Sequence, residues 1–332
     1  MSMPNFKIYG AKEIEHWIEK NINQVVEIIE DVYIKNSSKQ TINPDSYFLR
    51  YPNSKNRIIA LPASIEDEHS ISGIKWISSF PENISLGLDR ASAVFIANDR
   101  KTGYPIACLE GSLISSLRTA ASALIGAKYL HPNGNTIEQL GVIGCGLIAF
   151  NTIKLLKQYG WNIKKISLTD LSSERSKFFK SKIKDFSPSI IIEDLEETVS
   201  SSDMILFATS AAVPYFDNDL YLKHKPTVLH MSLRDISPEI ILQSQNVADD
   251  IDHSVKAQTS LHLAEQILNN RNFITESISD FITKKAKIDT NKTRVYSPFG
   301  MGILDLAIVR AILEEETATT EISNFFPQPY VE

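Results

Sequence analysis

The sequence has 332 residues, which is enough for two domains of ordinary size that each bury a core. Its formal net charge is -6 at pH 7, and this acidic balance argues against nucleic acid and anionic membranes as main partners, because both select basic surfaces. We therefore expect the partner to be a small molecule.

Cysteine and histidine usage excludes two further kinds of site. Cys108 and Cys145 offer no disulfide framework, and the seven histidines show no metal-ligand spacing, so no metal site is predicted. Residues 1–10 have no apolar signal core, and no run of about 18 apolar residues occurs anywhere in the chain. These observations predict a cytoplasmic protein.

The first third of the chain predicts one helix followed by short strands. Apolar residues recur at helical spacing over residues 11–32 and predict an amphipathic helix. Short runs rich in β-branched or aromatic residues then predict strands over residues 46–51, 57–62, 73–77, 92–98 and 104–110. The last two runs flank Asn-Asp-Arg-Lys-Thr-Gly, which indicates a hairpin.

An alanine-rich segment, residues 117–130, predicts a helix that links two domains. Ser115 and Ser116 are its candidate N-caps. The pattern then changes to strands alternating with helices, with strands expected over residues 140–143, 166–169, 190–192, 204–208, 227–233 and 246–248. Six strands of this kind predict an α/β domain with a doubly wound parallel sheet of the Rossmann type.

The C-terminal part predicts a connection and a helix. Residues 281–294 are polar and lysine-rich, and we interpret them as a linker, because such charge runs seldom form ligand patches. A final helix is expected over residues 304–314. Because the nucleotide-binding domain is already complete by then, we expect this helix to return to the first domain.

The most specific motif is a glycine turn between a strand and a helix. Gly144, Gly146 and Ala149 form a G-x-G-x-x-A sequence, and Asp170 ends the next strand 24 residues after Gly146. Gly144 allows the tight turn, Gly146 lets the backbone approach a pyrophosphate, and Ala149 keeps the helix close to the strand. A carboxylate at Asp170 accepts the ribose hydroxyls and repels a 2′-phosphate, so the predicted cofactor is NAD.

Other cofactor contacts follow from the same geometry. The N–H groups at the start of the helix, at Leu147 and Ile148, should face the phosphates. Ligands lie beyond the carboxyl ends of the strands in an open α/β sheet, and nicotinamide contacts are expected there. The candidates there are Thr209 and Ser210. Cys145, inside the turn, is interpreted as a small filler.

Asp235 is the candidate acid or base of the site. It follows the fifth predicted strand, where a carboxylate could move protons next to the nicotinamide. The sequence Asp-Ile-Ser-Pro-Glu suits a helix N-cap equally well, and the residues alone do not decide between the two roles. His230 lies within the strand, and we interpret it as a core histidine more readily than as a cofactor contact.

Several basic residues precede the nucleotide-binding domain. Arg118 is expected in the first turn of the linking helix, where a guanidinium and helix N–H groups together make a carboxylate site. Lys75 lies in an apolar strand, facing away from its two neighbours, and either lines a half-solvated strand or binds a carboxylate. With Arg50, Arg57 and Arg90 they form a basic face in an acidic protein, which indicates a substrate with several carboxylates.

The order of these features resembles that of the ornithine cyclodeaminase and μ-crystallin family over nearly the whole chain. The shared marks are Lys75, Arg118-Thr-Ala-Ala, the late glycine turn, Ala208-Thr-Ser with Pro214, Asp235, and Gly300 with Asp305. The resemblance implies that a Rossmann domain of residues 118–294 is inserted into an α+β substrate-binding and oligomerisation domain, formed by residues 1–117 and completed by 295–332. It also implies a homodimer and cofactor contacts at Met231, Ser232 and Gly300.

Within the family, stretches such as Arg57-Ile-Ile-Ala-Leu-Pro and Arg90-Ala-Ser resemble the dehydrogenases of 2,3-diaminopropionate biosynthesis in siderophore pathways. That resemblance implies NAD-dependent oxidative hydrolysis of the tricarboxylate N-(2-amino-2-carboxyethyl)-L-glutamate to L-2,3-diaminopropionate, 2-oxoglutarate and NADH. The implied substrate contacts are Arg50, Lys75, Arg90, Ser92 and Arg118, and the implied catalytic residues are Asp235 and Lys75. Arg234 stands where cyclodeaminases carry small residues, and an added cation suits an anionic substrate.

Two alternative functions remain open at this point. One is an ornithine or lysine cyclodeaminase, or a ketimine reductase. The other is a non-catalytic, nucleotide-dependent binding protein of the μ-crystallin kind, against which the complete set of Lys75, Arg118 and Asp235 argues.

Overall fold

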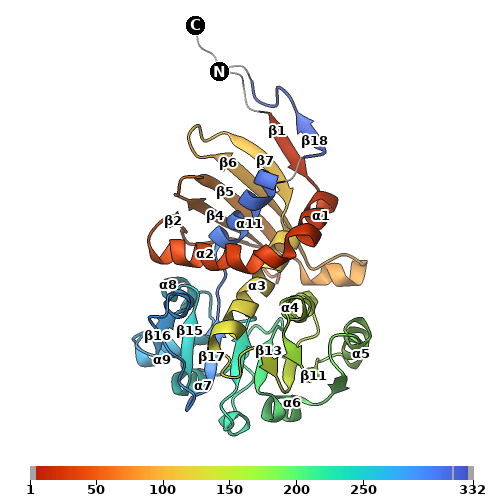
Figure 1. Ribbon diagram of the computed structural model, residues 1–332, viewed down its shortest axis with the longest axis vertical. Coiled ribbons are helices and arrows are strands. Elements are labelled where there is room, and N and C mark those ends of the chain that lie inside the picture. Colours follow the sequence, from red (N-terminus) through yellow and green to blue (C-terminus); the bar gives the residue numbers. More distant parts are fainter. Residues whose placement is uncertain (1–4, 316–317, 328–332) are drawn as a thin grey trace. The chain divides into compact units, whose positions relative to one another are not determined.

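The computed structural model describes residues 5–315 and 318–327, and the chain divides into two compact units (Figure 1). Unit 1 comprises Met1–Arg118 and Met301–Glu332, and unit 2 comprises Thr119–Gly300. The helix α3 (Ser112–Leu130) contains the first of the two boundaries.

Unit 1 is built on a mostly antiparallel sheet with the order β18-β1-β7-β6-β5-β4-β2, and β3 also pairs with β4. Its strands are β1 (Phe6–Tyr9), β2 (Thr41–Ile42), β3 (Tyr47–Arg50), β4 (Arg57–Ile65), β5 (Ile71–Ser79), β6 (Ala91–Asp99), β7 (Pro105–Glu110) and β18 (Thr320–Ile322). The predicted strands are confirmed, as is the hairpin, because β6 and β7 pair antiparallel.

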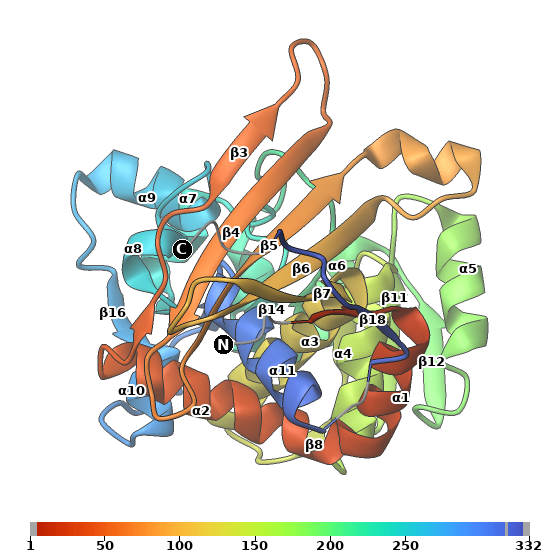
Figure 2. The ribbon, with the colours of Figure 1, turned by 90° about the horizontal axis from the view of Figure 1, so that it is seen from above.

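Helices cover one face of this sheet. The predicted helix over residues 11–32 is two helices, α1 (Ala11–Asn21) and α2 (Val25–Ser37), joined by the 3-10 turn η1 (Ile22–Gln24), and a second 3-10 segment, η2 (Pro81–Leu86), precedes β6. Both helices bury apolar residues at helical spacing, and this spacing continues across η1. The sequence pattern therefore did not indicate the break between α1 and α2. Figure 2 shows α11 (Gly302–Glu315) beside α2, and α11 also contacts β4 and β5, which confirms the predicted C-terminal helix.

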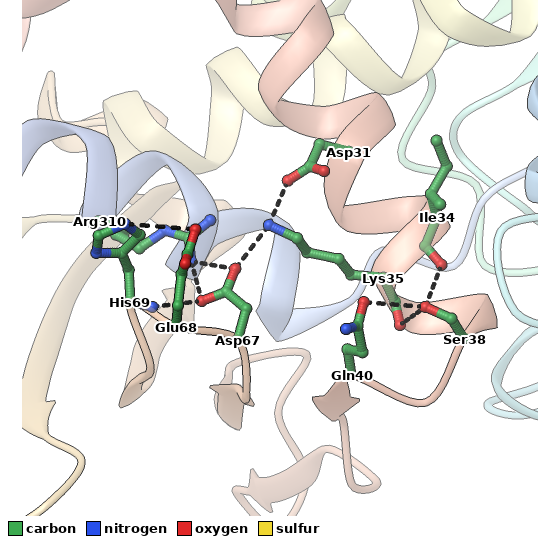
Figure 3. Close-up of polar contacts among 9 residues, drawn as sticks. All are labelled: Asp31, Ile34, Lys35, Ser38, Gln40, Asp67, Glu68, His69 and Arg310. Carbon is green, nitrogen blue, oxygen red and sulfur yellow. Dashed lines mark hydrogen bonds and ion pairs between the residues drawn. The ribbon is translucent and has the colours of Figure 1, made fainter.

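A charged clamp joins three elements of unit 1 (Figure 3). Asp67, in the turn between β4 and β5, accepts hydrogen bonds from Lys35 Nζ of α2 at 2.6 Å and from Arg310 Nη1 of α11 at 2.8 and 2.9 Å. Burial alone would raise the pKa of the Asp67 carboxyl, but the two cations outweigh burial and lower that pKa to about 2. The clamp therefore stays ionised at neutral pH.

Unit 2 contains an all-parallel sheet with the order β12-β11-β9-β13-β14-β17-β15-β16. Its strands are β9 (Leu140–Ile143), β11 (Lys165–Thr169), β12 (Ser189–Ile192), β13 (Met204–Phe207), β14 (Thr227–His230), β15 (Gln245–Ala248), β16 (Ile274–Ser277) and β17 (Arg294–Ser297). A separate parallel pair joins β8 (Thr136–Ile137) to β10 (Asn162–Ile163). The first five strands follow the 3-2-1-4-5 order of a doubly wound sheet, which confirms the predicted Rossmann-type fold.

Short helices connect these strands and flank the sheet in Figure 1. They are α4 (Leu147–Gln158), α5 (Ser173–Lys182), α6 (Leu195–Ser201), η3 (Asp219–Leu222), α7 (Pro238–Gln243), α8 (Ile251–Ser254), α9 (Ser260–Leu268) and α10 (Ile278–Ile282). Buried aliphatic and aromatic side chains from strands such as β13 and β14 and from the helices α7 and α9 form one continuous hydrophobic cluster in unit 2.

The interpretation of residues 281–294 as a linker is wrong. The Gln245 side chain bonds the backbone of Lys287 and Asp289 at 2.9 and 2.7 Å, so this segment is packed against β15. The strand β17, which was not predicted, then lies between β14 and β15, beyond the boundary expected at residue 294. It begins with Arg294, whose buried guanidinium donates to backbone carbonyls including Lys225 O at 2.6 Å. A charged first residue is not typical of a buried strand, and the sequence pattern therefore did not predict this one.

The helix α3 begins five residues earlier than predicted. The Glu110 carboxylate accepts hydrogen bonds from the backbone N–H groups of Ser112 and Leu113 at 2.7 and 2.9 Å and so caps the helix. Ser115 and Ser116 lie inside α3 and are not its caps. Arg118 is consequently one turn further from the helix N-terminus than expected.

Candidate functional site

The glycine turn after β9 has the backbone that a dinucleotide requires. Gly144 has φ +94°, and a Cβ there would lie 2.6 Å from the carbonyl oxygen of Ala208, so only glycine fits. A Cβ at Gly146 would meet no atom within 4 Å among the described residues, which leaves open space in front of α4. Gly146 is the N-cap of α4 and provides no side-chain cap, so the first N–H groups of that helix suit a phosphate.

Asp170, at the end of β11, is tied to this turn. Its Oδ2 accepts a hydrogen bond from the backbone N–H of Cys145 at 2.8 Å, and its Oδ1 accepts one from Ser172 at 2.9 Å. Each oxygen retains acceptor capacity for a ribose hydroxyl. Burial and the Asp170 charge raise the pKa of the Cys145 thiol to about 12, so this thiol stays protonated and unreactive.

A second group of polar residues surrounds Asp235, and we call it the Asp235 cluster. Its members are Thr209, Tyr215, His230, Ser232 and Asp235. Oδ1 of Asp235 accepts hydrogen bonds from the Thr209 hydroxyl and, at 3.0 Å, from the Tyr215 hydroxyl. Oδ2 accepts one from the Ser232 hydroxyl and lies 3.2 Å from His230 Nε2. The carboxylate itself is 0% exposed in unit 2.

The environment of Asp235 keeps it ionised. Burial alone would raise the pKa of its carboxyl, but hydrogen bonds from His230, Ser232 and Thr209 outweigh burial and hold that pKa below its ordinary value. The helix-cap interpretation is wrong, because the N-cap of α7 is Ser237, whose side chain accepts from the N–H of Ile240. Asp235 is therefore an anionic proton acceptor with no capping duty at α7.

Two members of the cluster were not predicted as functional. His230 is buried, as expected for a core histidine, but it also contacts Asp235 and its Nδ1 lies 3.2 Å from the Ser297 hydroxyl. Tyr215 carries no signal of a functional role in the sequence, because it lies in an irregular segment after β13 where the spacing of apolar residues gives no information. Only its proximity to Thr209 in the sequence could have indicated it.

A third group lies in unit 1, and we call it the Lys75 cluster: Lys75, Ser115, Arg118 and Asp305. Lys75, on β5, is 1% exposed, and its Nζ lies 2.6 Å from Asp305 Oδ2 on α11 and 3.1 Å from the Ser115 hydroxyl. Burial, aided by the charge of Arg118, lowers the pKa of Lys75 to about 8 although Asp305 opposes the shift. Arg118 Nε is 3.4 Å from the same Asp305 oxygen.

Hydrogen bonding in the Lys75 cluster is incomplete. Asp305 Oδ1 and Arg118 Nε are buried and have no hydrogen-bond partner among the described residues. Buried polar atoms rarely remain unpaired, and two cations against one carboxylate leave a positive excess. The first N–H groups of α3, which were expected beside Arg118, are capped by Glu110, so the positive charge of this cluster comes from the Arg118 guanidinium and from Lys75.

The remaining predicted substrate residues fall on different faces of the sheet. Strand register places Arg50 opposite Arg57 and Arg57 opposite Ser79, on the same face as Lys75. Ser92 pairs with Ser78, bonds its hydroxyl at 2.8 Å, and lies on the face opposite Lys75, so its contact with substrate stays a prediction. Arg90, before β6, reaches the Ser79 hydroxyl at 3.4 Å.

The predicted cofactor residues also differ in their availability. Ser210 is exposed, and Leu147, Ile148 and Met231 are not fully buried. The backbone N–H of Gly300 donates to Asp249 Oδ2 at 2.7 Å, and the cofactor contact of Gly300 stays a prediction.

Residues 5–315 and 318–327 contain no group of three or more side chains that could hold a metal ion. None of their helices is long and apolar enough to cross a membrane.

Comparisons with known proteins match this chain over both units. A model of the ornithine cyclodeaminase/mu-crystallin family matches residues 8–320. N-((2S)-2-amino-2-carboxyethyl)-L-glutamate dehydrogenase from Staphylococcus aureus is 31% identical over 270 residues, covering 78% of this chain and 79% of that protein. The crystal structure of CmnK has a TM-score of 0.85 at 24% identity and covers 94% of this chain and 95% of that chain. An archaeal alanine dehydrogenase, solved as a dimer with NAD, has a TM-score of 0.84 at 21% identity, covering 97% of this chain and 100% of that one.

Proposed function

Because the chain belongs to the ornithine cyclodeaminase/mu-crystallin family, we propose that it catalyses oxidative hydrolysis of N-(2-amino-2-carboxyethyl)-L-glutamate with NAD. The products are L-2,3-diaminopropionate, 2-oxoglutarate and NADH. The proposal places the enzyme in the biosynthesis of a siderophore or peptide natural product. It combines the identity to the Staphylococcus aureus dehydrogenase with the charges of the Lys75 cluster.

The cofactor is NAD, and the chain presents groups that fit it. Gly144 and Gly146 leave room for the pyrophosphate, the N-terminus of α4 supplies N–H donors, and Asp170 accepts the ribose hydroxyls. When bound, NAD accepts a hydride from the α-carbon of the glutamate part of the substrate, which bears the bridging nitrogen. The chain has to hold that carbon in place and move the protons.

The observation that carries the proposal is the incomplete Lys75 cluster. A carboxylate of the substrate satisfies Arg118 Nε and balances the positive excess, and an N–H of the substrate satisfies Asp305 Oδ1. Arg50 and Arg57 share the Lys75 face of the sheet and are the proposed partners of further carboxylates. A tricarboxylate uses more of these cations than alanine or ornithine does.

Asp235 is the proposed acid and base of the reaction. Its lowered pKa keeps it ionised, so that it accepts a proton from the water that attacks the imine and passes this proton to the bridging nitrogen. It then accepts the proton of the added hydroxyl and delivers it to nitrogen as the carbon–nitrogen bond breaks. Lys75 and Arg118 orient the substrate, which is a positioning role that needs fixed geometry.

We also propose that the enzyme is a homodimer that associates through unit 1. Trp76 and Val94 are directly opposite each other on the sheet face that α11 does not cover, and both are exposed. A Trp76→Glu variant should elute as a monomer in size-exclusion chromatography with light scattering, whereas the wild type elutes as a dimer. An unchanged mass in the variant would place the interface elsewhere.

The proposed reaction is tested by incubating the purified protein with NAD and each candidate amino acid. The expected result is nicotinamide absorbance that rises with the tricarboxylate, together with 2-oxoglutarate detected by mass spectrometry. Conversion of ornithine to proline without net NADH would identify a cyclodeaminase instead. Oxidation of NADH by a cyclic ketimine alone would identify a ketimine reductase.

A further inference from the structure

Both oxygens of the Asp235 carboxylate have hydrogen-bond partners within unit 2. A carboxylate offers about four lone-pair directions, two on each oxygen. Thr209 and Tyr215 donate to Oδ1, and Ser232 donates to Oδ2. His230 Nε2 lies 3.2 Å from Oδ2 and accepts a hydrogen bond from the Asp235 backbone N–H at 3.1 Å. Because the carboxylate is also fully buried, a substrate or water molecule cannot bond to it without displacing one of these partners.

Tyr215 is the member of the cluster best placed to meet a substrate. Its side chain is 42% exposed, although its hydroxyl bonds to the buried Asp235. The backbone fixes it there, because the N–H groups of Tyr215 and Phe216 both donate to the Asp235 carbonyl, at 3.0 and 2.9 Å. The phenol therefore has one end in the cluster and its ring at the surface of unit 2.

The other partners of Asp235 are less suited to carry protons outward. The Thr209 hydroxyl donates to Asp235 and also accepts a hydrogen bond from Ala211 N–H at 3.1 Å, so both of its functions are used. His230 is fully buried and its second nitrogen faces the Ser297 hydroxyl. Ser232 is only half-buried, and it is the comparison position in the test below.

We infer that Tyr215 is a further catalytic residue, which contacts the reacting groups and relays protons between them and Asp235. The inference rests on the proposed function, since it assigns the contact through which that acid and base acts. In water attack, the oxygen–carbon bond forms as a water proton moves to the phenol oxygen and the phenol proton moves to Asp235 Oδ1. The electron pair of the broken carbon–nitrogen π bond goes to nitrogen.

The relay then runs in reverse and protonates that nitrogen. A second cycle takes the remaining proton of the added hydroxyl and delivers it to nitrogen as the single carbon–nitrogen bond breaks. The products are an amine and a 2-oxo acid, and Asp235 and Tyr215 end in their original states. Burial and Asp235 raise the pKa of Tyr215, so the phenol exchanges protons in a concerted way and is not isolated as phenolate.

The first test is a Tyr215→Phe variant, which keeps the ring and removes the hydroxyl. We expect NADH formation in the first turnover to stay within about threefold of the wild type and the steady-state kcat to fall about 100-fold, because general acid–base catalysis contributes about that much. KM for NAD should not change. A Tyr221→Phe variant, in which the lost hydroxyl bonds Glu196 in the same unit, is the matched control and should behave as the wild type.

Ser232→Ala separates relay from support of the carboxylate. It removes one donor from Asp235, and we expect a kcat decrease of about tenfold or less with the same pH profile as the wild type. A Tyr215→Phe enzyme that retains half of the wild-type kcat would overturn the relay. A first turnover that falls in step with kcat would also overturn it, because Tyr215 would then be placing the substrate for hydride transfer.

A second test needs no substrate and separates the two proposals. The ultraviolet titration of Tyr215, taken as wild type minus Tyr215→Phe, should move toward the ordinary tyrosine pKa of about 10 in an Asp235→Asn background. A titration that Asp235→Asn leaves unchanged would overturn the coupling. If the wild type makes no NADH from the tricarboxylate, the proposed function fails, and the relay is judged by this titration and by Tyr215→Phe in ketimine reduction.

Discussion

The Asp235 cluster and the Lys75 cluster are both buried groups of polar side chains, but they differ in how far their hydrogen bonds are completed. Both oxygens of Asp235 accept hydrogen bonds from hydroxyl groups within unit 2. The Lys75 cluster leaves Asp305 Oδ1 and Arg118 Nε unpaired. The first is organised before any ligand arrives, which suits proton transfer, whereas the second is completed by a ligand, which suits binding.

The largest expected effect comes from removing the single negative charge of the Lys75 cluster. Asp305→Asn leaves Lys75 and Arg118 buried without a counter-charge, and the free energy of unfolding should fall by about 3 to 5 kcal/mol. Urea denaturation measures the loss. The matched control is Asp252→Asn, which breaks an exposed pair with Arg271 and should cost about 1 kcal/mol or less.

Removing the charge of the Asp235 cluster should act on activity more than on stability. Asp235→Asn keeps the shape of the side chain, and kcat should fall about 1000-fold because the proton acceptor is lost. The Kd for NAD, measured by calorimetry, should stay within about twofold. An Asp235→Asn enzyme with wild-type kcat would contradict the assignment and leave the Asp235 cluster a structural one.

The Lys75 cluster should also impose a pH dependence on substrate binding. Lys75 has a pKa of about 8 in the folded protein, so kcat/KM should fall about tenfold per pH unit above that value as the ammonium is lost. Lys75→Arg keeps the charge and should move the fall to higher pH. A wild-type profile that is flat up to pH 10 would contradict the role of Lys75 as a cation.

The lowered pKa of Lys75 also affects stability: kcat/KM should fall with rising pH, whereas the contribution of Lys75 to stability should rise. Because the folded-state pKa is below the unfolded value of 10.5, the unfolded chain binds more protons between about pH 8 and that value. The contribution of Lys75 to stability should therefore rise with pH across this window. Comparing the wild type with Lys75→Met by urea denaturation at several pH values measures it.

The Asp67 clamp is a paired ionic group outside both clusters, and its effect should be the smallest. Asp67 has a pKa of about 2 against an ordinary 3.8, so its contribution is complete above pH 4 and is lost as pH falls through about 2. The contribution is about 2 kcal/mol at neutral pH by that linkage. Asp67→Asn should lower the free energy of unfolding by that amount at pH 7, without changing KM.

Local patterns predicted the fold well because they depend on neighbouring residues. The glycine turn, the six alternating strands and the hairpin were all visible as spacing. Features fixed by distant partners were not. The strand β17 begins with Arg294, whose guanidinium donates to the carbonyl of Lys225, 69 positions away in the sequence. The start of α3 is different: its cap, Glu110, is only two residues from Ser112 but is not a residue type typical of helix caps.

The candidate site shows the same division. Lys75, Arg118 and Asp235 could be proposed from residue type and position, but the contact between Lys75 and Asp305 joins residues 230 positions apart and has no local signal. Tyr215 lies in a segment without periodicity, so its hydroxyl could be placed only by the fold. Ser92 lies on the face opposite Lys75, which follows only from the register between β5 and β6.

The position of β17 sets an order for the folding of unit 2 during synthesis. This strand pairs with β14, but it is synthesised after β15 and β16. One edge of β14 therefore stays unpaired until Arg294–Ser297 leaves the ribosome. Long-range parallel pairing of this kind is slow and exposes strand edges to other chains. A nascent chain that stops before residue 294 should therefore aggregate readily. In a longer chain, the sheet of unit 2 should become protected from protease only when β17 has been added.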